Sequence, residues 1–196
     1  MKKILLTGGA GYIGSHTCIE LLNSNYEVVV VDDLSNAVEE ALNRVEKLTG
    51  KSVAFYKVDL RDRPALDAVF KKEANVDALI HFAGKKAVGE SAEKPLVYYT
   101  NNITGSLTLF EVMRDNGVRD IVFSSSATVY GDPVEVPVKE NARIGATNPY
   151  GHTKVMIEQI LMDTGKACDW GVALLRYFNP VGAHHSGVIG EDPEYP

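Results

Sequence analysis

The chain lacks the features of membrane, secreted and nucleic-acid-binding proteins. It has two cysteines, Cys18 and Cys168, which are too few for a disulfide framework and do not have metal-ligand spacing. It contains no apolar run of about 18 residues that could span a bilayer, and no signal-peptide pattern follows Met1. The net charge is −6 and there is no basic tract. We therefore expect a cytoplasmic protein that binds neither nucleic acid nor membranes, with both cysteines buried as small hydrophobic residues.

What the chain does have is a regular alternation of apolar strands and amphipathic helices. Runs such as Val28 to Val31 are typical of strands that are buried on both faces. Such strands, alternating with helices, predict an α/β fold with a doubly wound parallel sheet. The predicted strands are residues 3–7, 27–32, 53–58, 76–82, 120–125 and 171–177, and the predicted helices are 12–24, 36–49, 62–74, 96–116 and 149–165.

A glycine-rich turn, Gly8-Gly9-Ala10-Gly11-Tyr12-Ile13-Gly14, joins the first strand to the first helix. Glycines allow a tight turn and a close approach of phosphate, and the free N–H groups of a helix N-terminus attract negative charge. Asp32 ends the next strand, where a carboxylate can accept hydrogen bonds from the ribose hydroxyls of NAD and repel the extra phosphate of NADP. The turn therefore predicts a Rossmann-like NAD site; the alternative is a glycine turn in an α/β fold without a nucleotide.

Small or polar residues recur where the predicted strands end. Ligands of doubly wound sheets bind at the carboxyl ends of the strands, so this recurrence favours one continuous cofactor cleft. The residues are Asp32 and Asp33, Asp59 and Leu60, Phe82 to Gly84, Ser124 to Ser126, and Tyr177 to Asn179.

Tyr150 and Lys154 follow Pro149, which suits the first turn of a helix. A spacing of four residues places both side chains on the same face of a helix. A nearby ammonium group favours the phenolate, so we expect Lys154 to lower the pKa of Tyr150 and make it a base. Ser126, just past a strand, can bond a substrate alcohol and help pass its proton to Tyr150. The alternatives are an ordinary surface helix, and serines that cap the following turn, with Ser124 as the candidate cap.

These residues resemble the extended short-chain dehydrogenase/reductase family and, within it, the UDP-glucose 4-epimerases. The resemblance covers nearly the whole chain. The stretches that carry it are Thr7 to His16, His81 to Gly84, Lys86 to Ser91, Ser124 to Gly131 and Leu175 to His184.

The resemblance implies an NAD-dependent isomerase of galactose metabolism that interconverts UDP-glucose and UDP-galactose. Tyr150 would take the proton of the sugar 4-hydroxyl while hydride leaves C4, and hydride would return to the opposite face of a 4-keto sugar. Lys154 would tune Tyr150 and hold ribose, and Ser126 would bond the reacting oxygen. The implied substrate-binding residues are Lys86, Ser126, Tyr150 and Asn179. The implied cofactor-binding residues are Gly8, Gly11, Tyr12, Ile13, Gly14, Asp32, Asp33, Leu34, Ser35, Asn36, Ala37, Asp59, Leu60, Phe82, Ala83, Gly84, Lys85, Lys86, Asn101, Ser124, Tyr150, Lys154, Tyr177 and Phe178.

Two local features refine this interpretation. Sugar-nucleotide 4,6-dehydratases resemble this chain but carry an acidic pair where it has Ala127 and Thr128, neither of which can act as the acid or base of an elimination. The adjacent His184 and His185 have no third ligand at suitable spacing, so we expect no metal.

We expect residues 1–178 to form the NAD-binding domain and 179–196 to begin a substrate-binding region that is largely absent from this chain. The chain would then bind NAD and turn over slowly or not at all. We also expect a homodimer through the helices 96–116 and 149–165, with Leu107, Phe110, Met113, Val155, Ile157 and Ile160 as contributors. The alternatives are an epimerase or reductase for another nucleotide sugar, and a non-catalytic NAD-binding dimerisation module.

Overall fold

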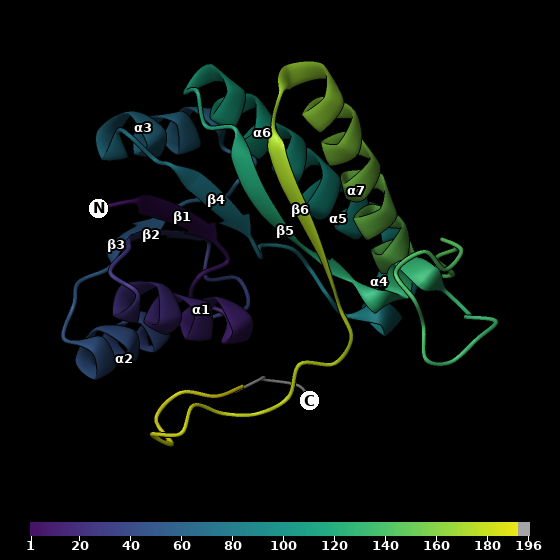
Figure 1. Ribbon diagram of the computed structural model, residues 1–196, viewed down its shortest axis with the longest axis horizontal. Helices are drawn as coiled ribbons and strands as arrows, with labels where there is room; N and C mark the ends of the chain where they lie inside the picture. The colour runs from purple at the N-terminus through teal and green to yellow at the C-terminus, as the bar shows by residue number, and fades with distance from the viewer. Residues whose placement is uncertain (192–196) are drawn as a thin grey trace.

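Six parallel strands form one sheet in the order β3-β2-β1-β4-β5-β6 in the computed structural model, which describes residues 1–191 (Figure 1). Every neighbouring pair of strands is parallel. This is the strand order of dinucleotide-binding sheets, so the predicted fold class is confirmed. The strands are β1 (Lys3–Thr7), β2 (Glu27–Asp32), β3 (Ala54–Lys57), β4 (Ala78–His81), β5 (Asp120–Ser126) and β6 (Gly171–Tyr177).

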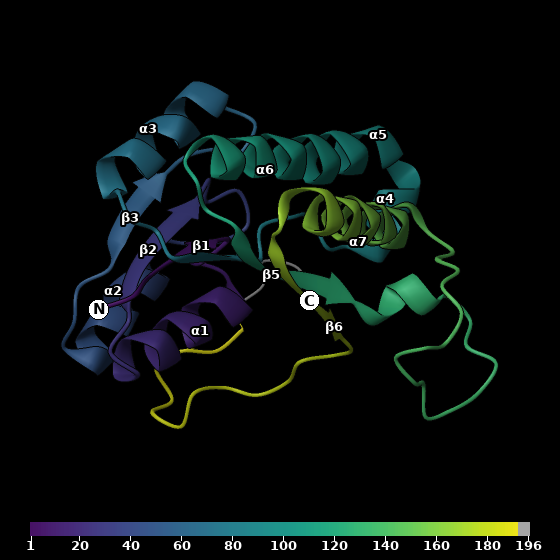
Figure 2. The same ribbon diagram turned by 45° about the horizontal axis from the view of Figure 1, so that its top comes forward.

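Helices cover both faces of the sheet (Figures 1 and 2). One face packs against α1 (Tyr12–Asn23) and α2 (Glu40–Thr49), and the other packs against α3 (Arg63–Glu73), α6 (Gly105–Asp115) and α7 (Pro149–Cys168). Successive strand residues point to opposite faces, so in β1 the side chain of Leu5 enters one core and that of Leu6 enters the other. Both leucines are fully buried, as the apolar pattern predicts.

The segment before β5 differs from the single helix that we expect over residues 96–116. It consists of α4 (Val88–Glu93), α5 (Pro95–Tyr98), the π-helix η1 (Tyr99–Thr104) and α6. Lys94 has non-helical dihedral angles and Pro95 has no N–H to continue α4, so α4 ends there and α5 starts at the proline. Single-turn π-helices occur frequently at functional sites, and this one leads to the site described below.

Three other expectations about the elements need correction. The chain at residues 36–39 is not helical, and α2 begins only at Glu40. Helix α7 continues beyond residue 165 to Cys168, because the chain leaves it only at Asp169, which has a left-handed conformation. Cys168 is therefore exposed on the last turn of α7, whereas Cys18 is fully buried as expected.

Between β6 and residue 191 the chain has no regular secondary structure and returns along α1 and α2 (Figure 2). The Tyr12 hydroxyl donates to the Gly182 carbonyl at 2.5 Å, Arg44 donates to the Val188 carbonyl at 3.1 Å, and Ile189 is buried in the core on this face. The predicted substrate-binding region at 179–196 thus lies against the first two helices as far as residue 191, and residues 192–196 lie outside the described part. Within residues 1–191, none of the helices has the length and apolar character that crossing a membrane requires.

Candidate active site

The carboxyl ends of β1, β2, β4, β5 and β6 bring the predicted site residues to one edge of the sheet. The glycine turn follows β1, and the chain after β4 lies against it, since Phe82 and Ala83 both donate backbone hydrogen bonds to the Thr7 carbonyl, at 3.0 and 3.1 Å. The serines of β5 pair in register with β6 up to Ser126 and Tyr177. Asp59 and Leu60 follow β3 at the same edge, so residues from all six strands, far apart in sequence, share it.

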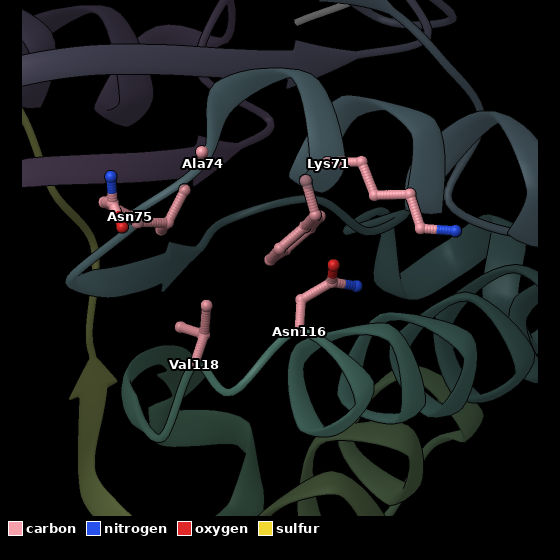
Figure 3. A pocket seen from close by; sticks show the side chains of 7 residues that line it. Lys71, Ala74, Asn75, Asn116 and Val118 are labelled. Carbon is pink, nitrogen blue, oxygen red and sulfur yellow. The ribbon is translucent and has the colours of Figure 1, made fainter.

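A shallow cavity of about 170 Å³ lies at the opposite edge of the sheet, where β4 and β5 begin (Figure 3). Its lining includes Asn75, Val76, Asn116 and Val118, and its charged group is Lys71, which forms an ion pair with Asp67. Its lining contains no Asp, Glu, His, Cys, Ser or Tyr side chain, and its lysine is engaged in that ion pair. The carboxyl edge is the better candidate.

Packing requires glycine at three positions of the turn, Gly8, Gly9 and Gly14, and leaves space at Gly11. A Cβ on Gly9 would lie 2.7 Å from Cγ2 of the buried Val30. A Cβ on Gly8 would lie 2.6 Å from the Ala83 nitrogen, and Gly8 has a φ of +71°. A Cβ on Gly14 would lie 2.3 Å from the Gly8 carbonyl oxygen. Gly11 is the N-cap of α1, and a Cβ there would meet only the Gly8 oxygen, at 3.4 Å. The first intrahelical bond runs from the Ser15 N–H to Gly11, so the helix end remains available to an anion.

Asp32 joins the end of β2 to this turn. Its carboxylate accepts from the Ala10 N–H at 3.1 Å and from the Leu34 N–H at 2.9 Å, and it is buried. Burial raises the pKa of Asp32, and the two amide hydrogen bonds act in the opposite direction. Asp59, also expected at this end, is bonded to the guanidinium of Arg61, which lowers its pKa. Residues Asp33 to Ala37 form the loop between β2 and α2.

The structure brings Ser126, Tyr150 and Lys154 together on β5 and α7, and all three are buried. The Lys154 ammonium donates to the Ser124 carbonyl at 2.7 Å and lies 5.8 Å from the centre of the Tyr150 ring. The capping serine is Ser126 and not Ser124, because the Ser126 hydroxyl oxygen accepts from the Thr128 N–H at 3.2 Å. Ser124 contributes its carbonyl instead.

The electrostatics of this group differ from the expectation. Burial raises the pKa of Tyr150, with hydrogen bonding to Ser126 acting in the opposite direction. Burial also lowers the pKa of Lys154 to about 8, opposed by the negative charge of Glu158. The expected lowering of the Tyr150 pKa by Lys154 is therefore wrong for the chain without a ligand, because desolvation of the phenol dominates.

The π-helix η1 holds the loop after β4. Buried Asn102 accepts from the Lys85 N–H at 2.9 Å, donates to the Lys85 carbonyl at 3.1 Å, and donates to the Thr153 hydroxyl of α7 at 3.1 Å. Asn101, the predicted residue, donates to the Asn102 side chain. Sequence reasoning missed Asn102, although two adjacent asparagines inside an amphipathic helix were a visible signal.

The remaining predicted residues lie at the end of β6 and in the loop after β4. Tyr177 is half-buried, and burial raises its pKa. Phe178 and Asn179 are exposed, and Lys86 forms an ion pair with Glu191 at 3.0 Å. Among residues 1–191 no group of three or more His, Cys, Asp and Glu side chains could hold a metal ion.

Comparisons with known proteins agree with this geometry. Residues 4–191 match the model of the NAD dependent epimerase/dehydratase family. The chain is 64% identical over 191 residues to UDP-glucose 4-epimerase of Bacillus subtilis, covering 97% of this chain and 56% of that protein. It is 59% identical to UDP-glucose 4-epimerase 2 of Arabidopsis thaliana, covering 98% of this chain and 56% of that protein.

The crystal structure of UDP-glucose 4-epimerase from Bifidobacterium longum, in complex with NAD+ and UDP, superposes with a TM-score of 0.96 at 53% identity, covering 98% of this chain and 58% of that one. The chain thus spans somewhat more than half the length of the curated relatives it matches. From its match over 188 of its residues, 4 to 191, this chain belongs to the NAD dependent epimerase/dehydratase family.

Proposed function

We propose that this chain is the NAD-binding and catalytic part of a UDP-glucose 4-epimerase, which interconverts UDP-glucose and UDP-galactose in galactose metabolism. The observation that carries the proposal is the meeting of Ser126, Tyr150 and Lys154 beside an open helix N-terminus at one sheet edge. The similarity to UDP-glucose 4-epimerases supports the choice of reaction. The absence of side-chain carboxylates at Ala127 and Thr128 speaks against a dehydratase.

The residues at this edge fit NAD. The turn at Gly8, Gly11 and Gly14 leaves room for a pyrophosphate at the start of α1. Asp32 retains carboxylate lone pairs for ribose hydroxyls, and its charge disfavours the phosphate of NADP. The Lys154 ammonium would hold the nicotinamide ribose. When bound, the nicotinamide supplies the acceptor and donor of the hydride at C4 of the sugar.

The chain's own groups handle the proton. The Tyr150 phenolate would take the proton of the sugar 4-hydroxyl and become a phenol, and this phenol would return the proton to the C4 oxygen after the sugar has presented its other face. The Ser126 hydroxyl holds the reacting oxygen, and the positive charge of Lys154 favours the phenolate of Tyr150 once the site is filled. Burial of all three excludes water, which strengthens these interactions. Asn179 and Lys86 are the candidates for contacts with the nucleotide sugar.

The exposed apolar side chains support a homodimer through α5, α6 and α7. Leu96, Leu107, Met156 and Met162 lie on these helices and are 39 to 78% exposed. Of the residues expected at this face, Phe110, Met113 and Ile157 belong to the core instead, because they point toward the sheet. Val155 and Ile160 are half-buried. We further propose a cytosolic location, which the unpaired thiols of Cys18 and Cys168 support.

The test is conversion of UDP-galactose to UDP-glucose by this chain with added NAD. Product that falls by about 10²-fold or more in Tyr150→Phe supports the proposal, since the phenylalanine keeps the packing and loses the hydroxyl. The control is Tyr26→Phe, which removes a phenol from the loop before β2. Equal product from Tyr150→Phe would refute the role of Tyr150 and favour the non-catalytic binding module. A folded, NAD-binding chain without product is the outcome expected where turnover requires a complete substrate-binding region.

The same assay distinguishes a UDP-glucose 4-epimerase from an epimerase or reductase that acts on another nucleotide sugar. Equal or faster conversion of N-acetylated or pentose nucleotide sugars would indicate an epimerase of broader or different specificity. A net change in the absorbance of reduced nicotinamide during turnover would indicate a reductase, because an epimerase returns the hydride in each cycle.

A further inference from the structure

Glu158 is a buried carboxylate on α7 to which the mechanism above gives no role. It follows Lys154 by one helical turn and Tyr150 by two, so the three side chains lie along one face of α7. Only 3% of its side chain is exposed. A carboxylate is rarely buried to this extent unless it has partners.

The partners of Glu158 come from two neighbouring strands. The Glu158 Oε1 atom accepts from the Ser125 hydroxyl of β5 at 2.5 Å. The two carboxylate oxygens of Glu158 also accept from Arg176 of β6: Oε1 from Nε at 3.0 Å and Oε2 from Nη2 at 2.7 Å. Arg176 in turn donates to the Tyr130 hydroxyl and to the Glu140 carbonyl, each at 3.0 Å. The Glu158 carboxylate thus joins α7 to β5 and β6, and Arg176 extends the junction to the segment between β5 and α7.

This junction lies directly beneath the catalytic group. Ser125 stands between Ser124, whose carbonyl accepts from the Lys154 ammonium, and Ser126, whose hydroxyl faces the site. Any slippage of β5 against α7 would change both contacts. A buried ion pair adds little net stability compared with apolar residues of the same volume, so folding alone is a weak reason for its presence here.

The charges around Lys154 give Glu158 a second effect. From α7 the groups that face the ammonium are Tyr150 and Glu158, from β5 the Phe123 ring and the Ser124 carbonyl, and from β4 His81. Arg176 reaches this region from β6 through Glu158. Burial lowers the pKa of His81 to about 3, so this imidazole is neutral at pH 7.

The helices α4 and α5, which also pack against α7, bring Glu90 and Tyr98, and these two groups bond to each other at 2.8 Å. Glu158 is therefore the carboxylate in position to balance the buried ammonium. Its negative charge is the effect that raises the pKa of Lys154, against the lowering by burial.

We propose that Glu158, clamped by Arg176, is a positioning residue for Lys154: its carboxylate holds the end of β5 against α7 and balances the charge of the buried ammonium. Only the effect of Lys154 on cofactor binding depends on the proposed function. The charge balance itself is a property of the chain without a ligand, and it is measured there.

The experiment follows the Nζ nitrogen of Lys154 by NMR as a function of pH, in the cofactor-free chain labelled at lysine Nζ and assigned with Lys154→Met. We expect a midpoint near pH 8 for the unmodified chain. In Glu158→Gln the midpoint falls by about one pH unit or more, because the balancing charge is lost. In Arg176→Gln it rises, because the carboxylate is no longer neutralised by the guanidinium.

The opposite signs separate positioning by charge from simple structural damage, which would move both midpoints in the same direction. Asp163→Asn is the matched control, since it removes an exposed carboxylate from the same helix and should leave the midpoint unchanged. If Glu158→Gln does not fold, Glu158→Asp and Arg176→Gln still decide the matter: a retained midpoint in the first and a raised one in the second support the proposal. An unshifted midpoint in Glu158→Gln or in Arg176→Gln, or shifts of equal sign in both, would overturn it.

A parallel NAD titration distinguishes this inference from the proposed function. We expect the affinity of Glu158→Gln for NAD to fall relative to the unmodified chain more at about pH 8 than at about pH 6, because its Lys154 loses the proton earlier. A pH-independent loss of affinity would overturn the link to the cofactor. Opposite Nζ shifts in a chain that binds no NAD would uphold the charge balance and refute the proposed cofactor.

Discussion

Alanine substitutions at three glycines, Gly14, Gly11 and Gly89, separate the effect on stability from the effect on NAD binding. Gly14→Ala is expected to disturb both. The new Cβ would lie 2.3 Å from the Gly8 carbonyl oxygen and 2.7 Å from the Gly9 Cα, and neither backbone atom can rotate away. Overpacking of this kind costs about 1–3 kcal/mol. For a chain of 196 residues this corresponds to a fall in Tm of about 2–12 °C, together with loss of NAD binding because the turn must shift.

Gly11→Ala and Gly89→Ala complete the series. At Gly11 the nearest atom is 3.4 Å from the new Cβ and φ is −72°, so we expect a Tm change of about 2 °C or less, with at least a tenfold loss of NAD affinity, because the methyl group occupies the opening above α1. Gly89 has no neighbour within 4 Å and lies in α4, so its alanine variant should keep both properties. Thermal unfolding and calorimetric NAD titration measure the two quantities. An unchanged Tm in Gly14→Ala, or full NAD affinity in Gly11→Ala, would refute the reasoning.

Three further predictions concern charge and surface. Asp32→Asn should weaken NAD binding by about 10- to 100-fold, because a charge-assisted hydrogen bond contributes about 1.5–3 kcal/mol, and it should reduce the preference for NAD over NADP. If the substitution changes neither the NAD titration curve nor the NADP titration curve, the assignment of Asp32 is contradicted. The His81 imidazole bonds to Thr7 and Ser106 and stays neutral in the fold to about pH 3, whereas in the unfolded chain it gains a proton below about 6.5. The unfolded chain therefore binds more protons than the folded chain below pH 6.5. The free energy of unfolding, measured by urea titration, should fall by about 1.4 kcal/mol per pH unit below that pH. A free energy of unfolding that stays constant down to about pH 5 would argue against a buried neutral His81. Leu107→Glu combined with Met156→Glu should convert a dimer into a monomer, as measured by light scattering, and the monomer should stay folded by circular dichroism because both side chains are exposed in the single chain. An unchanged mass would place the interface elsewhere.

The parts of the site that are local in sequence could be predicted from it. The glycine turn, Asp32 at the end of β2, and the pair Tyr150 and Lys154 depend on spacings within one strand–turn–helix unit or one helix, so residue type and period suffice. The roles of these residues in catalysis stay predictions until they are measured.

What the sequence could not show depends on long-range packing. Glu158 bonds to Ser125 and Arg176, which are 33 and 18 residues away, and no periodicity indicates that pairing. The direction of the Tyr150 pKa shift depends on how deeply the phenol is buried, which only the packed structure defines. The break near Pro95 was visible as a proline, but the π-helix after it is held by tertiary hydrogen bonds of Asn102 to residues 85 and 153.

The strand order also governs how this chain must emerge during synthesis. β1 is made first and ends up in the middle of the sheet, with β2 and β4 as its neighbours. β4 begins 71 residues after β1 ends, at Ala78 against Thr7, so one edge of β1, whose three central residues are apolar, has no native neighbour until Ala78 has been translated. The nascent chain therefore carries an unpaired, aggregation-prone edge while the residues between β1 and β4 are translated, and chaperones that bind extended apolar segments are most needed in that interval.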